Sequence, residues 1–112
     1  VVAEAIVLLE ASGLDASVGL DVLAGGLAGS RIHELKRETM VAREFQPGFR
    51  IDLHHKDMGI ILDAARDAGV ALPVGNLVAA LIASARAQGY GQLDHSALLK
   101  VAEGLSGKAG AA

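Results

Sequence analysis

The sequence predicts an all-α domain, a bundle of about six helices, on three observations. Hydrophobic residues make up 52% of the 112 residues and aromatic residues only 3%, a composition that favours close-packed helices over a β-sandwich. Glycines punctuate the chain, and the residues between them are mostly helix formers. No segment reads as a strand of useful length, because the one alternating stretch, FRIDL, is short and has no partner strand. The length suits one domain that buries a core without metal or disulfide support.

The first part of the chain is predicted to form three helices. The first is periodic from its opening residues and ends at Gly13. Asp15 caps a short second helix that runs to Leu23, and a third helix spans about residues 30–43. The segment AGGLAGS lacks the spacing of a dinucleotide-binding or phosphate-binding loop, so it is predicted to be a helix–helix turn. Because neither an initiator methionine nor a capping residue precedes the first helix, we expect the chain to be cut from a longer protein.

Three further helices are predicted after a break at FQPGF, residues 45–49, where proline and glycine favour a turn. The fourth helix is predicted over residues 48–69 and is closed by Gly69. Pro73 begins a fifth helix that is apolar almost all round, which predicts that it is the central and most buried one. Asp94 caps a sixth helix, whose core-facing stripe is predicted to be Leu98, Val101 and Leu105.

Charge and apolar patterning exclude several classes of partner. The formal charge is -3 and the basic residues are scattered, so no nucleic-acid partner is predicted. The richest apolar stretch, LVAALIASARA, is broken by Ser84 and Arg86 and is too short to span a bilayer, so no membrane partner is predicted either. The chain has no cysteine and shows no signal peptide, which favours a reducing, cytoplasmic location.

The fourth predicted helix carries an acid on its apolar face. On a helical wheel Asp57 falls in the middle of the apolar arc, and His54 falls on the same arc. A buried carboxylate without a partner is costly, so Asp57 needs either a function or a buried partner such as a helix N-terminus, Arg50 or Arg31. The residues alone leave both alternatives open.

The neighbours of Asp57 give few other candidates for chemistry. Lys56 and Asp57 point about 100° apart on the wheel, so they are not expected to pair with each other. The alternative to a function for Lys56 is a solvated lysine paired with Asp52. A metal shared by His54 and Asp57 would need a third ligand, and only His95 remains, so no metal site is predicted. Without a cofactor motif or a nucleophilic triad, the chain is expected to be part of a site completed elsewhere.

Four segments together resemble the C-terminal helical domain of the β-hydroxyacid dehydrogenases, namely EAIVLLEASGLD, LAGGLAGSRIHE, FQPGFRIDLHHKDMGIILDAARDAGVALPV and LDHSALLKVAEGL. That family includes 3-hydroxyisobutyrate dehydrogenase and tartronate semialdehyde (2-hydroxy-3-oxopropionate) reductase, and LDHSAL is more similar to the reductase branch. The resemblance implies the C-terminal domain of a 6-phosphogluconate dehydrogenase-like enzyme that lacks its Rossmann domain. The helical domain would cover residues 1–106, and residues 107–112 would form a flexible tail.

The resemblance also implies roles for three residues. Asp57 matches the acid of the family's Lys-Asp pair, which reaches the catalytic cleft, and Lys56 matches the lysine that lies towards the cofactor. Phe49 matches an aromatic residue that lines the substrate pocket. The family's catalytic lysine and its glycine-rich nucleotide turn have no counterpart in the chain. We therefore expect NAD or NADP to bind the full-length parent, and this fragment alone to bind neither and to be inactive.

The implied parent is an NAD(P)-dependent dehydrogenase or reductase of small β-hydroxyacids or semialdehydes, similar to tartronate semialdehyde reductase. Its partners would be the missing N-terminal Rossmann domain, the small substrate, and further copies in a homodimer or homotetramer. The competing interpretation is a free-standing helical domain for protein interaction or dimerisation, without catalysis.

Overall fold

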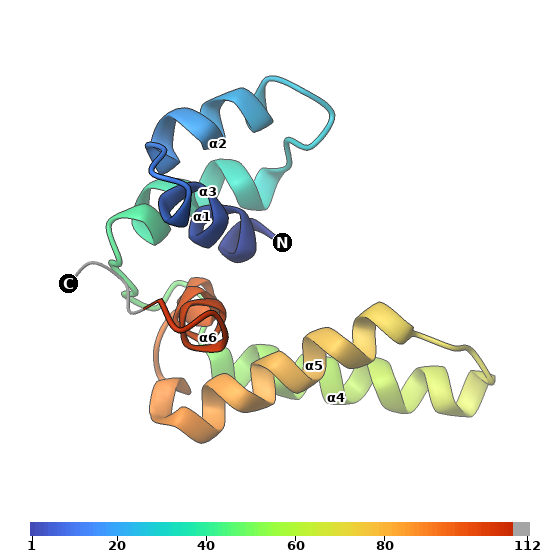
Figure 1. Ribbon diagram of the computed structural model, residues 1–112. Helices are drawn as coiled ribbons and strands as arrows, with labels where there is room; N and C mark the ends of the chain where they lie inside the picture. The colour runs from blue at the N-terminus through green and yellow to red at the C-terminus, as the bar shows by residue number, and fades with distance from the viewer. Residues whose placement is uncertain (109–112) are drawn as a thin grey trace. The chain divides into compact units, whose positions relative to one another are not determined.

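The structure, a computed structural model, describes residues 1–108 of the chain. Over that range it contains helices and no strand, which confirms the all-α fold class (Figure 1). The six α-helices are α1 (Val2–Ala11), α2 (Ala16–Ala24), α3 (Arg31–Val41), α4 (Ile51–Ala68), α5 (Pro73–Ala85) and α6 (Leu98–Leu105). A π-helical turn, η1 (Arg86–Tyr90), follows α5, and a 3₁₀ turn, η2 (His95–Ala97), precedes α6.

The helices belong to two compact units. The first unit comprises Val1–Phe45 and the segment from Leu99 onward, and the second comprises Gln46–Leu98. The first unit therefore holds α1, α2, α3 and nearly all of α6, whereas the second holds α4, α5, η1 and η2.

In the first unit, α1, α2 and α3 pack against one another, and side-chain caps hold α2, as predicted for Asp15, and α3. Asp15 Oδ1 accepts a hydrogen bond from the Val18 N–H at 3.2 Å, and Ser30 Oγ accepts one from the His33 N–H at 3.1 Å. The segment AGGLAGS forms the turn between α2 and α3, as predicted. The buried apolar side chains of the unit are Ile6, Val7, Ala16, Leu20, Met40, Phe45, Leu99 and Val101.

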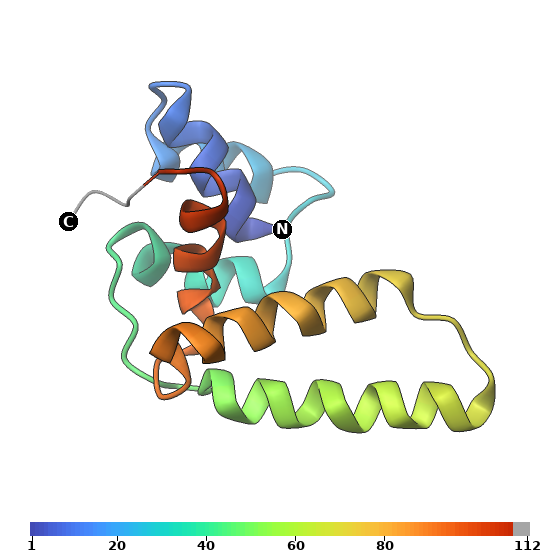
Figure 2. The same ribbon diagram turned by 60° about the horizontal axis from the view of Figure 1, so that its bottom comes forward.

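In the second unit, α4 and α5 lie side by side as a helical hairpin in both views (Figures 1 and 2). Gly69 ends α4 with a φ of 69°, a left-handed conformation that costs glycine little, and Pro73 is the first residue of α5. The buried apolar side chains are Ile51, Met58, Ile82, Ala85 and Ala97, near the start of α4 and the end of α5. The hairpin is therefore packed at that end, where the predicted site residues lie.

The prediction that the fifth helix is the most buried is wrong. Only Ile82 and Ala85 of α5 are buried, both near its C-terminal end, whereas Val74 is 71% exposed and Leu77 is 62% exposed. Within its unit α5 packs mainly against α4 and η1, which leaves much of its circumference open. An apolar pattern reports what a helix could bury, and the neighbours decide what it does bury.

The predicted stripe of the sixth helix is only partly correct. Val101 is buried, but Leu105 is 76% exposed, and Leu99 is fully buried in place of Leu98. Glu103 lies four residues after Leu99 on the same buried face, where an ion pair holds it. Because that face includes a charged residue, the pattern of apolar residues could not reveal it.

Residues 107–112 are predicted to form a flexible tail. The last helix ends at Leu105, and residues 109–112 of the predicted tail lie outside the described residues. Within residues 1–108, no helix combines the length and apolar character that crossing a bilayer requires.

Candidate functional site

Phe49 lies directly before α4, in a cluster with two histidine rings. Its ring centroid is 5.7 Å from that of His54 and 5.4 Å from that of His95, where the two planes meet edge to face at 83°. The His54 and His95 centroids are also 5.4 Å apart. Each ring therefore touches the other two, and none can rotate freely without disturbing its neighbours.

A buried carboxylate anchors this ring cluster. Asp94 is 2% exposed, and its Oδ1 accepts hydrogen bonds from the N–H groups of Gly48 at 3.0 Å and Phe49 at 2.9 Å. Its Oδ2 accepts from the Ser96 N–H at 3.1 Å and from the Ser96 hydroxyl at 2.5 Å. The His95 N–H also donates to the Phe49 carbonyl at 2.7 Å. These bonds join the turn before α4 to η2, which explains why α4 begins at Ile51 and not at residue 48.

His54 is a partly buried member of the ring cluster, and its pKa is shifted. Burial lowers its pKa from the ordinary value of histidine, and the nearby Asp57 carboxylate opposes that effect only in part. The Nδ1 atom of His54 is buried and has no hydrogen-bond partner within the described residues. Both observations favour the neutral imidazole.

Asp57 is not the buried acid that the wheel predicted. Its side chain is 45% exposed, and its ion-pair partner is Lys56, whose Nζ lies 3.6 Å from Asp57 Oδ1. The expected buried partners, Arg50 and Arg31, are not used: Arg50 binds Gln92 and Arg31 binds Glu34. The wheel places Cα directions, whereas the flexible lysine stem can reach a neighbouring carboxylate. Both predicted residues of the Lys-Asp pair therefore stand at the surface of α4.

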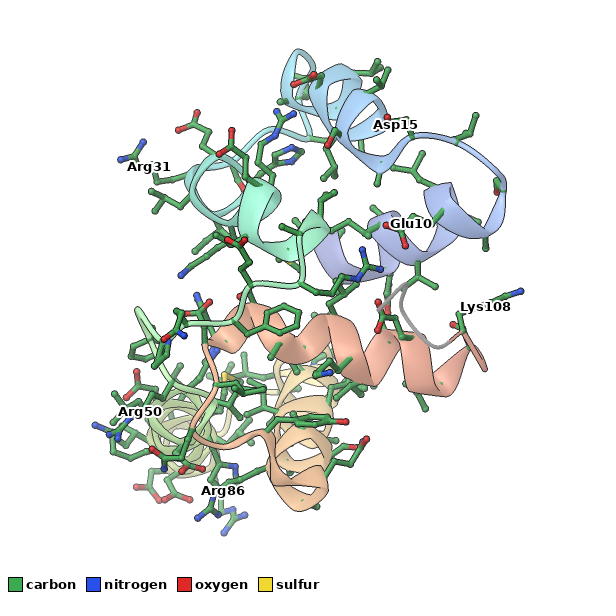
Figure 3. The ribbon with its side chains drawn as sticks, turned by 90° about the vertical axis from the view of Figure 1, so that its left-hand side faces the viewer. Glu10, Asp15, Arg31, Arg50, Arg86 and Lys108 are labelled. Carbon is green, nitrogen blue, oxygen red and sulfur yellow. The ribbon has the colours of Figure 1, made fainter. Side chains whose placement is uncertain are left out.

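The predicted pairing of Lys56 with Asp52 is also wrong. Asp52 accepts hydrogen bonds from Arg86 Nε at 2.7 Å and from Gln92 Nε2 at 2.9 Å. These three residues and His55 line an open hollow of about 500 Å³, on the side of the second unit marked by Arg86 in Figure 3. A Cβ atom at Gly91 would collide with the Asp52 carboxylate, so any larger residue there would push this carboxylate away from its present position. None of the predicted site residues lines this hollow.

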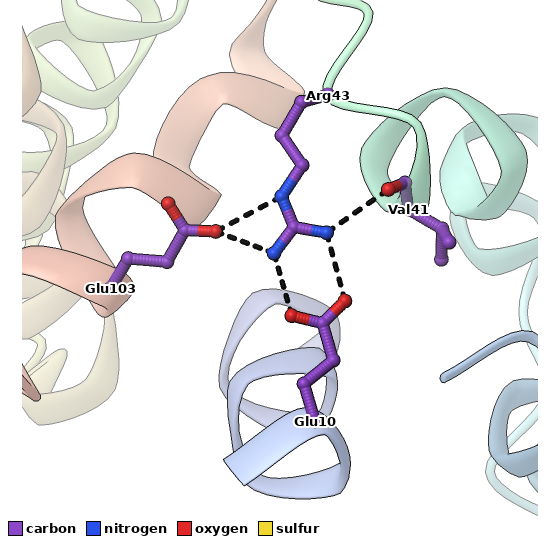
Figure 4. A network of polar contacts seen from close by, with 4 residues as sticks. All are labelled: Glu10, Val41, Arg43 and Glu103. Atoms are coloured by element: carbon purple, nitrogen blue, oxygen red, sulfur yellow. Dashed lines mark hydrogen bonds and ion pairs between the residues drawn. The ribbon is translucent and has the colours of Figure 1, made fainter. Parts of the chain in front are cut away.

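The first unit contains a separate ionic network (Figure 4). Arg43 Nη1 and Nη2 donate to the two carboxylate oxygens of Glu10 at 2.8 and 2.7 Å, and Arg43 Nε and Nη2 donate to Glu103 Oε1 at 3.1 and 2.6 Å. The hydrogen bonds to Glu10 and Glu103 raise the pKa of Arg43, and the hydrogen bonds from Arg43 lower the pKa of Glu10. It also has a φ of 55°, which is uncommon for a residue other than glycine. Every member of the network is bound to protein, so it is structural.

The sequence proposes Phe49 and Asp57 as site residues but does not predict the groups that hold Phe49 in place. The sequence puts His54 three residues from Asp57 on one helical face, but it indicates no role for His54 beyond that of a possible metal ligand. Asp94 was expected as a helix cap and does accept from Ser96, but its bonds to Gly48 and Phe49 cross a gap of 45 residues or more. No local pattern signals such bonds. Within residues 1–108, no cluster of three or more potential ligands could hold a metal ion.

Comparison with known proteins identifies relatives of nearly the whole chain. The family described as "NAD-binding of NADP-dependent 3-hydroxyisobutyrate dehydrogenase" matches residues 1–102. The chain is 39% identical over 102 residues to 2-hydroxy-3-oxopropionate reductase of Escherichia coli K12, covering 91% of this chain and 35% of the relative. It is 38% identical over 110 residues to 3-sulfolactaldehyde reductase of the same organism, covering 95% of this chain and 37% of the relative.

Two solved structures share the fold. A crystal structure of 3-hydroxyisobutyrate dehydrogenase from Salmonella typhimurium matches with a TM-score of 0.85 at 29% identity, over 89% of this chain and 35% of that one. The Mycobacterium tuberculosis 3-hydroxyisobutyrate dehydrogenase with L-serine matches with a TM-score of 0.77 at 30% identity, over 89% of this chain and 36% of that one. The chain thus spans about a third of the length of these relatives.

Proposed function

The chain belongs to the NAD-binding family of NADP-dependent 3-hydroxyisobutyrate dehydrogenases, and we propose that it is the C-terminal helical domain of such an enzyme. The complete protein would transfer hydride between NAD or NADP and a small β-hydroxyacid or semialdehyde. Its N-terminal part would be a Rossmann domain, and the active site would lie where that domain meets α4. Similarity to 2-hydroxy-3-oxopropionate reductase favours a semialdehyde of that kind as the substrate.

The observation that supports this proposal is the surface formed by Phe49, His54 and Asp57. Phe49 contacts the His54 ring, and the Asp57 carboxylate acts electrostatically on the same imidazole, so His54 links the aromatic ring to the acid. Asp57 and Lys56 are exposed enough to meet groups from outside the chain. An accessible acid beside a fixed aromatic ring is what a shared interdomain site requires from this half.

Each residue has a distinct task in the proposed reaction. When bound, the nicotinamide supplies the hydride chemistry. The Phe49 ring excludes water from one wall of the pocket, and Lys56 offers a positive charge towards the anionic cofactor. The Asp57 carboxylate orients the proton-donating lysine expected from the remainder of the protein and favours its charged form. The isolated chain, which lacks that lysine, should neither bind NAD(P) tightly nor reduce a semialdehyde.

The test is Asp57→Asn in the full-length protein, measured by steady-state kinetics with 2-hydroxy-3-oxopropionate as substrate. We expect turnover to fall by about one to three decades, the usual range for losing one electrostatic or proton-handling group. The denaturation midpoint of the 112-residue chain should not change. The Asp57 side chain is 45% exposed, and its ion-pair partner Lys56 is itself exposed, so the substitution leaves no buried group unpaired.

Asp63→Asn provides the matched control, because Asp63 is an exposed acid of the same helix. It should leave both turnover and stability unchanged. A wild-type full-length protein that neither reduces a semialdehyde with NAD(P)H nor oxidises a β-hydroxyacid with NAD(P) would refute the proposed function. Normal specific activity in Asp57→Asn would show that Asp57 has no catalytic role.

A further inference from the structure

His54 has a position and a hydrogen-bonding state that suit a third contact with the substrate. Resting on the proposed function, we propose that the His54 imidazole lines the substrate pocket between Phe49 and Asp57. There it donates a hydrogen bond from Nε2–H to a carbonyl or carboxylate oxygen of the substrate. It would act as a specificity-determining group, and not as the proton donor.

The position follows from contacts on both sides of the imidazole. The His54 ring lies 5.7 Å from the Phe49 ring, centroid to centroid, and Asp57 follows His54 by three residues on the same face of α4. The Asp57 charge acts on the His54 ring. A pocket that is lined by both Phe49 and Asp57 must therefore include the side chain between them.

The donor assignment follows from the two ring nitrogens. Nδ1 is buried without a partner, so protonating it would leave an N–H group with no acceptor, which is rarer and costlier than an unsatisfied lone pair. Nε2 has no hydrogen bond within residues 1–108 and is not among the buried unpartnered atoms, so it reaches solvent. The proton of the neutral ring therefore belongs on Nε2, which faces outward as a free donor.

The ring is also held in place before any ligand arrives. His95 contacts it from η2 at a centroid distance of 5.4 Å, and Asp94 fixes both the backbone before Phe49 and the start of η2. A donor that is already immobilised loses little conformational entropy on binding. This is the property expected of a group that selects one substrate geometry over another.

The test compares His54→Phe, His54→Gln and His55→Phe in the full-length protein. His54→Phe keeps a ring against Phe49 but removes the donor, so kcat/KM for the acid substrate should fall about 10-fold to 100-fold while KM for NAD(P) is unchanged. His54→Gln restores an N–H donor and should recover part of that loss. His55 lines the open hollow beside Asp52 and not this surface, so His55→Phe should have no effect.

A spectroscopic measurement on the 112-residue chain separates this inference from the proposed function. Nitrogen-15 NMR of the imidazoles should show His54 neutral at pH 7 with its proton on Nε2. A proton on Nδ1, or unchanged kcat/KM for His54→Phe in an active enzyme, would overturn the inference alone. An inactive wild-type protein would instead refute the proposed function, and with it the substrate contact.

Discussion

At the scale of single residues, the buried carboxylate of Asp94 controls the geometry of the candidate site without reaching it. Four hydrogen bonds end on its two oxygens, from the Gly48 and Phe49 N–H groups and from the N–H and hydroxyl of Ser96. Replacing it by alanine would leave these donors without their acceptor and release the turn that carries Phe49. In the proposed site Asp94 would thus be a positioning residue, because it holds the turn that carries Phe49.

We expect Asp94→Ala to lower the free energy of unfolding of the chain by about 2 kcal/mol, the combined effect of a lost cap and unsatisfied amides. The Phe49 and His95 ring resonances should also broaden or shift, because the ring cluster loses its anchor. Urea denaturation and NMR spectra would measure the two effects.

Two milder changes make the prediction about Asp94 specific. Ser96→Ala removes only the 2.5 Å hydroxyl bond, so it should leave the Phe49 resonances in place. Asp94→Asn can still accept a hydrogen bond from the Phe49 N–H. Its free energy of unfolding should therefore lie between those of Asp94→Ala and the wild type. Unchanged ring resonances in Asp94→Ala would show that Phe49 is held by other contacts.

Residue identity was easier to predict from the sequence than residue pairing. Phe49, Lys56 and Asp57 are proposed as site residues because they occur in one short motif, and their proposed roles rest on that motif. Their partners could not be found in this way, because Asp94 and His95 lie about 40 residues further along the chain. The exposure of Asp57 was also missed, since a wheel shows which residues share a face but not whether that face is covered.

At the scale of elements, the helix ends were predictable and the helix neighbours were not. Asp15, Gly69 and Pro73 mark their ends through interactions within one helical turn, so the sequence contains the full signal. The burial of α5 depends on what packs against it, and its apolar composition misled the prediction. The buried face of α6 could not be predicted either. It includes the charged residue Glu103, whose burial depends on an ion pair with Arg43, 60 residues away in the sequence.

The network around Arg43 joins α1, the end of α3 and α6 within the first unit. The Glu103 side chain is 8% exposed, so Arg43→Ala would leave a nearly buried carboxylate unpaired. We expect this change to lower the free energy of unfolding by about 3 kcal/mol, measured by urea denaturation. Arg31→Ala is the control, because its ion pair with Glu34 is highly exposed and should contribute less than about 1 kcal/mol.

The same network predicts how stability depends on pH. The pKa of Glu10 is lowered by its hydrogen bonds to Arg43, so the folded state binds a proton less readily than the unfolded state. The stabilisation is therefore fully present above the ordinary glutamate pKa of about 4.3, and it is lost as the pH falls through the lowered value. Arg43→Ala should lose less additional stability than wild type over this acidic range. If both proteins lose the same free energy of unfolding at acidic pH, Glu10 is not the source of that loss.

At the scale of the whole molecule, the helical hairpin of the second unit exposes several large apolar side chains. Exposed aliphatic side chains occur on both helices of its hairpin, namely Ile60, Ile61, Val74 and Leu77. Large apolar side chains exposed on two adjacent helices are a feature of interaction surfaces. Because closed symmetric assemblies are the commonest way to cover such a surface, we expect a second copy of the chain to cover it.

The prediction is a homodimer or homotetramer that depends on the α4–α5 hairpin. Leu77→Glu places a charge on the 62% exposed leucine of α5, so it should shift the sedimentation profile to monomer without lowering the denaturation midpoint of the monomeric fold. Leu27→Glu is the matched control, since Leu27 is fully exposed in the turn between α2 and α3 of the first unit. It should leave the assembly intact. If the wild-type chain sediments as a monomer at high concentration, the apolar face of the hairpin does not pair with itself, and the remainder of the full-length protein becomes its expected cover.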